Sequence, residues 1–126
     1  MPLVFTSCST PMAKSAETKS AGPVIKNLLV SDLHGVAGKE VIVSHVTIPP
    51  HTTLPTHWHP GEELVYLIEG AATEWRDGKE FATMKAGEAV KVPYKQVHAA
   101  STGEEGATIL VVRVHDKGQP HRVLVK

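Results

Sequence analysis

Short apolar segments separated by turn-forming residues run through most of the chain, and they predict β-strands. The segments cover residues 24–30, 41–48, 64–68, 72–76, 79–83, 89–92, 107–114 and 123–125. Gly and Pro punctuate them at intervals of about 8–12 residues, a spacing typical of all-β sandwiches and barrels. Asp77 and Gly78 favour a two-residue hairpin between two of these strands. No segment shows a convincing helical period, so we expect an antiparallel β-barrel.

The beginning of the chain differs from the rest, which predicts a flexible tail over 1–22 and one barrel domain over 23–126. The tail is rich in Ser, Thr, Ala and Lys and has no strand or helix period. Residues 3–8 resemble the end of a bacterial lipoprotein signal, where an apolar segment and small residues precede a cysteine. Two interpretations of Cys8 stay open: the remnant of a longer, exported precursor, or an incidental cysteine in a cytoplasmic protein.

Length, charge and cysteine content narrow the classes of function. A chain of 126 residues suits one domain with one hydrophobic core. Its 13 basic and 13 acidic residues cancel and are interspersed, which argues against a nucleic-acid partner. The single cysteine excludes an internal disulfide and a Cys-rich zinc site. No apolar run reaches the roughly 18 residues of a membrane span. Eight histidines are many for this length and direct attention to metal chemistry.

His57, His59 and Glu63 form the clearest chemical pattern in the sequence. Residues two apart in a strand face the same side, so the two histidines project together. A tight Pro-Gly turn follows, and the next strand can return Glu63 beside the imidazoles. Two imidazoles and one carboxylate on a common face make a metal site with positions left open for water or substrate. His98 is the best candidate for a fourth ligand from another strand.

These residues resemble the two motifs of the cupin family, G-x5-H-x-H-x3-E-x6-G and G-x5-P-x-G-x2-H-x3-N. The first motif corresponds to residues 51–70 and the second to residues 87–102. The resemblance covers about residues 35–114, and residue type and spacing agree at many positions together. Residues 38–40, 59–63 and 116–120 also look like small bacterial cupins, many of which are similar to quercetin-dioxygenase-type cupins. The resemblance implies a single jelly-roll barrel and identifies the metal ligands as His57, His59, Glu63 and His98.

Three positions depart from the cupin motifs. His51 and Lys95 stand where the family prefers Gly, and Thr102 stands where it prefers Asn. None of the three is a ligand position. Glycine serves at such places for backbone freedom and Asn for local hydrogen bonds. We therefore expect the departures to affect turns, not the metal site.

Strand alternation predicts what surrounds the metal. If Glu63 points into the barrel, Val65 and Leu67 point inward as well and form an apolar floor that favours an organic substrate. The residues that alternate with them face outward. Three large apolar side chains on the outer face favour a protein–protein contact, and a homodimer interface would bury them. These outward residues are Leu64, Tyr66 and Ile68.

Residues beside the ligands are candidates for catalytic roles or for the cavity mouth. A carboxylate or phenol in a turn next to a ligand can act as general acid or base. The candidates are Trp58, Glu62 and Tyr94, and also Tyr66 if its strand is bulged. For Glu62 and Lys95 a plain surface role is the simpler interpretation. The other histidines are expected to be structural (His45) or on the surface (His34, His115 and His121).

The sequence favours a metal-dependent enzyme that acts on a small organic molecule, through dioxygenase-like oxidoreductase chemistry or isomerase-like chemistry. The alternative is a non-catalytic cupin module that binds a metal or a small ligand. Imidazole and carboxylate ligands accept several divalent ions, so Fe or Mn is favoured while Ni, Zn, Co and Cu remain open. Neither the substrate nor the reaction follows from the sequence.

Overall fold

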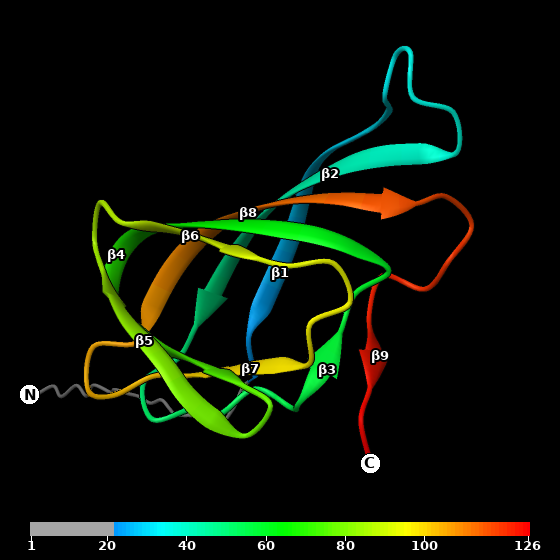
Figure 1. Cartoon of the computed structure of the whole chain (residues 1–126). Helices are drawn as coiled ribbons and strands as arrows, with labels where there is room; N and C mark the ends of the chain where they lie inside the picture. Colours follow the sequence, from blue (N-terminus) through cyan, green and yellow to red (C-terminus); the bar gives the residue numbers. More distant parts are fainter. Residues whose placement is uncertain (1–21) are drawn as a thin grey trace, which may run out of the picture.

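All regular structure in residues 22–126, the part of the chain that this computed structural model describes, is β-strand (Figure 1). Residues 1–21, which hold most of the predicted tail and Cys8, lie outside the described part. No helix in residues 22–126 is long and apolar enough to cross a membrane. The strands are β1 (Val24–Asp32), β2 (Lys39–Ile48), β3 (His57–Trp58), β4 (Gly61–Arg76), β5 (Lys79–Lys85), β6 (Ala89–Val92), β7 (His98–Ser101), β8 (Ala107–Asp116) and β9 (Val123–Leu124).

The strands form one curled antiparallel sheet in the order β1-β2-β8-β4-β7-β3-β9, and β5 and β6 both pair with β4. β4 organises this arrangement because its first half pairs with β6 and β8 while its second half pairs with β5 and β7. A strand shared in this way bends the sheet around its inner face, as Figure 1 shows. The all-β antiparallel barrel architecture predicted from the sequence is confirmed.

β4 runs through Gly70, where the sequence predicted a break between two strands. The pairing of β4 with β8 shifts register between Leu67 and Glu69 and then continues at Gly70. Gly70 has a φ of 85°, a left-handed conformation that glycine adopts without a steric penalty. The glycine therefore bends the strand without ending it. By contrast, Asp77 and Gly78 form the predicted hairpin turn, with φ values of 51° and 79°.

Alternation along β8 divides the inner face of the sheet into an apolar part and a polar part. Every second residue of β8 is buried, beginning with Ala107 and Ile109 and ending with Arg113 and His115. The apolar part is the hydrophobic core, which comprises Val46, Ile48, Leu67, Met84, Ala107, Ile109 and Val111. The prediction that His115 lies on the surface is wrong, because β8 extends to Asp116 and turns this side chain, with 0% exposure, inward.

Candidate metal centre

The four residues that the cupin motifs single out lie together at the polar part of the inner face. His57 belongs to β3, His59 follows that strand, Glu63 lies in β4, and His98 begins β7. His57 and His98 are direct partners across the β3–β7 pair. The imidazole centroids are 4.4 Å apart for His57 and His98, 4.8 Å for His57 and His59, and 5.2 Å for His59 and His98. All four side chains are buried.

Gly61 positions Glu63 through a close approach of two backbones. A Cβ atom at Gly61 would lie 2.0 Å from the carbonyl oxygen of Val114 and 2.8 Å from Cα of His115. Only glycine therefore lets the start of β4 pack this tightly on β8. Two residues later, Glu63 points into the same space as the imidazoles.

Backbone carbonyls hold the Nδ1 atoms of all three imidazoles. Nδ1 lies 2.6 Å from the Pro55 oxygen in His57 and 2.8 Å from the Gln96 oxygen in His98. In His59 it lies 2.7 Å from the His121 oxygen. A carbonyl only accepts hydrogen bonds, so each Nδ1 carries a proton and donates. In a neutral imidazole, this leaves the Nε2 lone pair free to act as a ligand.

The carboxylate of Glu63 faces two of these Nε2 atoms. Its Oε2 is 3.2 Å from Nε2 of His59, and its Oε1 is 3.3 Å from Nε2 of His98. With Nδ1 protonated, a neutral imidazole would present a lone pair to the carboxylate, so a proton or a cation belongs between them. Nε2 of His59 has no hydrogen-bond partner within the described residues. The donor set thus fits a divalent cation: a carboxylate plus three imidazoles whose ligand atoms lie within 4.8 Å of one another.

The pKa values in the centre reflect burial and mutual contact. Burial raises the pKa of Glu63, but its close contacts with His59 and His98 outweigh burial and hold this pKa well below its usual range. The pKa of His98 is raised, because hydrogen bonding and attraction to Glu63 outweigh the lowering by burial. The pKa of His57 falls to about 4, mainly because burial disfavours the charged ring. His57 is therefore neutral at neutral pH and offers its Nε2 lone pair.

Arg113 is a further buried residue of the centre and was not among the candidates from the sequence. It is paired with Glu63 across β4 and β8, and its Nε lies 3.7 Å from Oε2 of Glu63. Its Nη2 donates a hydrogen bond to Oγ of Ser44 at 3.2 Å. In the sequence Arg113 lies inside an apolar run, where a charged residue is usually taken to face the solvent. Counting every second residue from Ile109 would have found it.

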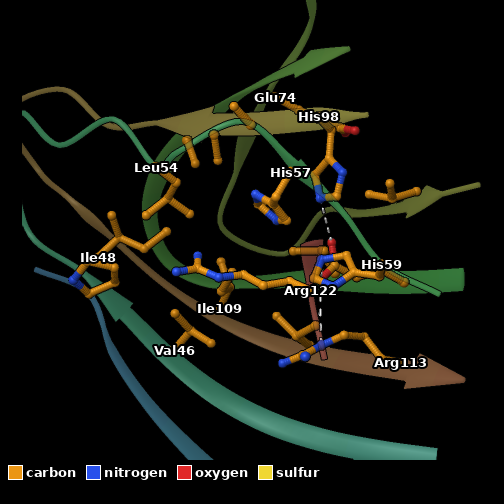
Figure 2. A pocket seen from close by; sticks show the side chains of 18 of the residues that line it. Val46, Ile48, Leu54, His57, His59, Glu74, His98, Ile109, Arg113 and Arg122 are labelled. Atoms are coloured by element: carbon orange, nitrogen blue, oxygen red, sulfur yellow. Dashed lines mark ion pairs between the residues drawn. The ribbon is translucent and has the colours of Figure 1, made fainter. Parts of the chain in front are cut away.

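The centre opens into a cavity of about 280 Å³ that contains both polar and apolar walls (Figure 2). The proposed metal ligands occupy one end. Val65 and Leu67 line the cavity, as strand alternation predicted, with further apolar side chains from β2, β5, β6 and β8. Glu74, which was not a sequence candidate, also lines the cavity near His98.

None of the four catalytic candidates from the sequence lines this cavity. Tyr66 faces outward with 46% exposure, as regular alternation requires. Glu62 forms an ion pair with Lys91 at 2.9 Å. The Tyr94 hydroxyl donates a hydrogen bond to Asp116. Trp58 is partly buried, and the Lys95 ammonium lies 5.7 Å from its ring centroid.

Comparison with known proteins places the chain in a family. The Cupin domain family model matches residues 44–113, which is more than half of the chain. A search of curated proteins found no match.

Several solved structures share the fold. The DMSP lyase DddQ from Ruegeria pomeroyi aligns with a TM-score of 0.69 at 22% identity, over 82% of this chain and 52% of the lyase. A cupin-like protein from Thermotoga maritima aligns with a TM-score of 0.68 at 22% identity, over 83% and 77% of the two chains. The polyketide cyclase RemF from Streptomyces resistomycificus aligns with a TM-score of 0.57 at 18% identity, over 78% and 81%.

This chain spans only about half of the lyase, and identities at this level establish a common fold. The family match covers β3 to β7, most of β8 and all four clustered residues. The curled antiparallel sheet and the motif residues gathered inside it agree with that match. The chain belongs to the cupin family.

Proposed function

We propose that this protein binds one divalent transition-metal ion through His57, His59, Glu63 and His98 and uses it on a small organic substrate in the adjoining cavity. The observation that carries the proposal is the set of three Nδ1–carbonyl contacts, which leave three clustered Nε2 lone pairs free, two of them facing the Glu63 carboxylate. Burying these groups without a cation would be costly, because lone pairs of imidazole and carboxylate would face each other.

The chain's own residues prepare the cavity for chemistry on an organic molecule. A bound ion would supply Lewis acidity or, if redox-active, the activation of dioxygen. Val65 and Leu67 contribute to an apolar wall that binds the organic body and limits water. Glu63 and Arg113 lie in contact, so the arginine holds the carboxylate in place.

Both dioxygenase-like and isomerase-like reactions suit this arrangement. Two structural neighbours are a lyase and a cyclase by name, so the fold hosts more than one kind of reaction. A set of three imidazoles and one carboxylate accepts Fe and Mn, which we favour, and also Ni, Zn, Co and Cu. The identity of the ion therefore decides which class of reaction to search first.

A non-catalytic binding module is the second candidate, and one observation favours it. The four sequence-predicted acid–base and aromatic candidates lie outside the cavity. Glu74 and His121 line the cavity and are the alternative proton carriers. Glu74 is buried, and its Oε1 has no hydrogen-bond partner among the described residues. A protein that only stored or sensed a ligand would need no proton carrier in the cavity and so would not depend on Glu74 or His121.

The test compares two neighbouring carboxylates. Glu63→Gln removes the charge in the centre, whereas Glu62→Gln removes the same charge from an ion pair outside the cavity. Thermal unfolding is followed while Fe²⁺, Mn²⁺, Ni²⁺ or Zn²⁺ is added to metal-free protein. Stabilisation of the wild type and of Glu62→Gln, but not of Glu63→Gln, supports the site. Equal stabilisation of all three proteins contradicts it. Loaded wild-type protein is then screened for oxygen uptake and for isomerisation on enols and diols.

The proposal includes a homodimer, which the outer face of the sheet supports. Leu64, Tyr66 and Ile68 are exposed by 45%, 46% and 44%, in agreement with their predicted outward direction. β1 also exposes large apolar side chains, among them Val24 and Leu28. Neighbouring exposed apolar groups of this size are typical of protein–protein contacts.

A further inference from the structure

The cavity beside the proposed metal centre is lined by equal numbers of acidic and basic residues, but one of the acidic residues is already paired with an arginine outside the lining. Apart from histidines, its charged lining residues are Glu63, Glu74, Arg113 and Arg122. Glu74 is neutralised by Arg76, whose Nε donates to Oε2 of Glu74 at 2.7 Å. Two arginines therefore face a single remaining carboxylate, and in the proposed function that carboxylate is a metal ligand.

Arg113 has unused hydrogen-bonding capacity although it is buried. Only 7% of the residue is exposed, and its Nε has no hydrogen-bond partner among the described residues. Nη2 is occupied by Ser44, whose hydroxyl in turn donates to Asn27 at 2.6 Å. This Nε lies 3.7 Å from Oε2 of Glu63, which is too far for a hydrogen bond. A buried donor without an acceptor is costly, so a guanidinium nitrogen that lacks a hydrogen bond in a cavity wall marks the place of an acceptor.

Arg122 brings a second positive charge to the same space from the other side. It belongs to the segment between β8 and β9 and extends into the cavity, as Figure 2 shows. No ion-pair partner of Arg122 is present in residues 22–126. Among the described residues, the cavity lining holds no carboxylate besides Glu63 and Glu74 that could neutralise the two arginines.

We propose that the cavity takes a small organic acid, whose carboxylate is held by Arg113 and Arg122 and whose apolar body lies against the apolar wall. Guanidinium groups match the geometry of a carboxylate and form charge-assisted hydrogen bonds with it. The apolar wall includes Val46, Leu67 and Ile109. An inorganic anion has no apolar part that could contact this wall, so the wall favours an organic acid. This assignment of substrate class rests on the proposed function, because it takes the same cavity as the substrate site.

The experiment compares two probes of nearly equal shape, hexanoate and its neutral amide, hexanamide. Their affinities are measured by calorimetry on the metal-loaded protein and on the metal-free protein, since a carboxylate can also bind a metal directly. We expect hexanoate to bind roughly tenfold more tightly than hexanamide in both forms, the size of one charged hydrogen bond. Equal affinity of the two probes for the metal-free protein would overturn the proposal.

Arg122→Gln tests the arginine directly, because an exposed side chain can be replaced without disturbing the fold. Lys79→Gln is the matched control, since it removes one exposed positive charge outside the cavity. We expect Arg122→Gln to weaken hexanoate about three- to fivefold and to leave hexanamide unchanged. If Lys79→Gln has the same effect as Arg122→Gln, only the general charge of the protein matters and the proposal is wrong.

The two proposals fail in different ways. If metal binds through Glu63 but hexanoate and hexanamide bind equally, the proposed function stands and the organic-acid substrate class is refuted. If the protein binds no metal but prefers hexanoate in a way that depends on Arg122, the organic-acid site stands and the metal-dependent function is refuted.

Discussion

The backbone oxygen of His121 lies 2.7 Å from Nδ1 of His59 and so joins the end of the chain to the proposed metal centre. The two residues are 62 positions apart. β9 anchors this connection by pairing with His57 and Trp58 of β3. The last residues therefore orient one imidazole through a hydrogen bond to its other ring nitrogen, a contact that typically tunes metal ligands.

This contact predicts that truncation after Pro120 weakens metal binding while His121→Ala does not. The truncation removes the carbonyl that fixes the tautomer of His59 and also β9, which pairs with His57, whereas the alanine variant keeps both. Contacts of this kind are typically worth about 10–100-fold in metal affinity. Competition with a chromophoric chelator measures the affinity. Equal weakening in both variants would show that the side chain of His121, not its carbonyl, carries the effect.

Metal-free protein should lose stability as the pH falls from 6.5 toward 4, in part because of His115. This ring is fully buried, and burial chiefly lowers its pKa to about 4, with repulsion from Arg113 adding to the effect. The unfolded chain takes up the proton near pH 6.5 while the folded chain resists it, so folding is favoured above 6.5 and loses that advantage below. Two and a half pH units correspond to about 3 kcal/mol.

Urea unfolding of the wild type and of His115→Gln at pH 7.5 and pH 5 measures this contribution. The variant should lose less stability between the two pH values than the wild type. His57 contributes in the same direction, so part of the loss remains. Parallel losses in the two proteins would show that His115 titrates normally in the folded state.

Replacing His51 or Lys95 by glycine should stabilise the folded protein. Both stand at positions where the cupin motifs prefer Gly, and both have positive φ, 53° and 60°. A residue with a Cβ atom pays roughly 1–2 kcal/mol in this conformation. His51→Gly and Lys95→Gly should therefore each raise the free energy of unfolding by about 1 kcal/mol. Lys91→Gly, in the regular strand β6, is the control and should lower it.

The outer face of the sheet predicts that the protein in solution has twice the mass of one chain. A charge introduced at Tyr66 or Ile68 should dissociate this dimer, because burying an unpaired charge is costly. Light scattering after size exclusion measures the mass of Ile68→Lys and of the control Val36→Lys, an exposed apolar position in the loop between β1 and β2. A monomeric wild type, or a dimer that Ile68→Lys leaves intact, would remove this interface.

Much of the fold was predictable because strands and turns leave local signals. The segments 41–48 and 89–92 became β2 and β6 with little change, and Asp77 with Gly78 made the expected hairpin. β7 was missed because its four residues, His-Ala-Ala-Ser, have neither length nor alternation. Its strand character comes from pairing with β3 and β4, which is a tertiary effect.

The candidate centre was predictable for its four motif residues, which the structure brings together. The residues that surround and orient these four ligands were not predictable. The carbonyl of His121 has no sequence signal, since every residue carries one. Arg113 was hidden in an apolar run, and His115 was placed on the surface because β8 was expected to end at Val114. Thr102, by contrast, shows how a departure is accommodated: its hydroxyl donates to the Pro49 oxygen at 2.6 Å and accepts from the Thr52 amide.

Elemental analysis of protein purified without added metal tests the central claim most directly. The wild type should carry about one equivalent of a divalent transition metal per chain. His98→Ala should lose it, while His45→Ala, a change in β2 outside the cavity lining, should keep it. No metal in any preparation, or the same metal content in wild type and His98→Ala, would contradict the account.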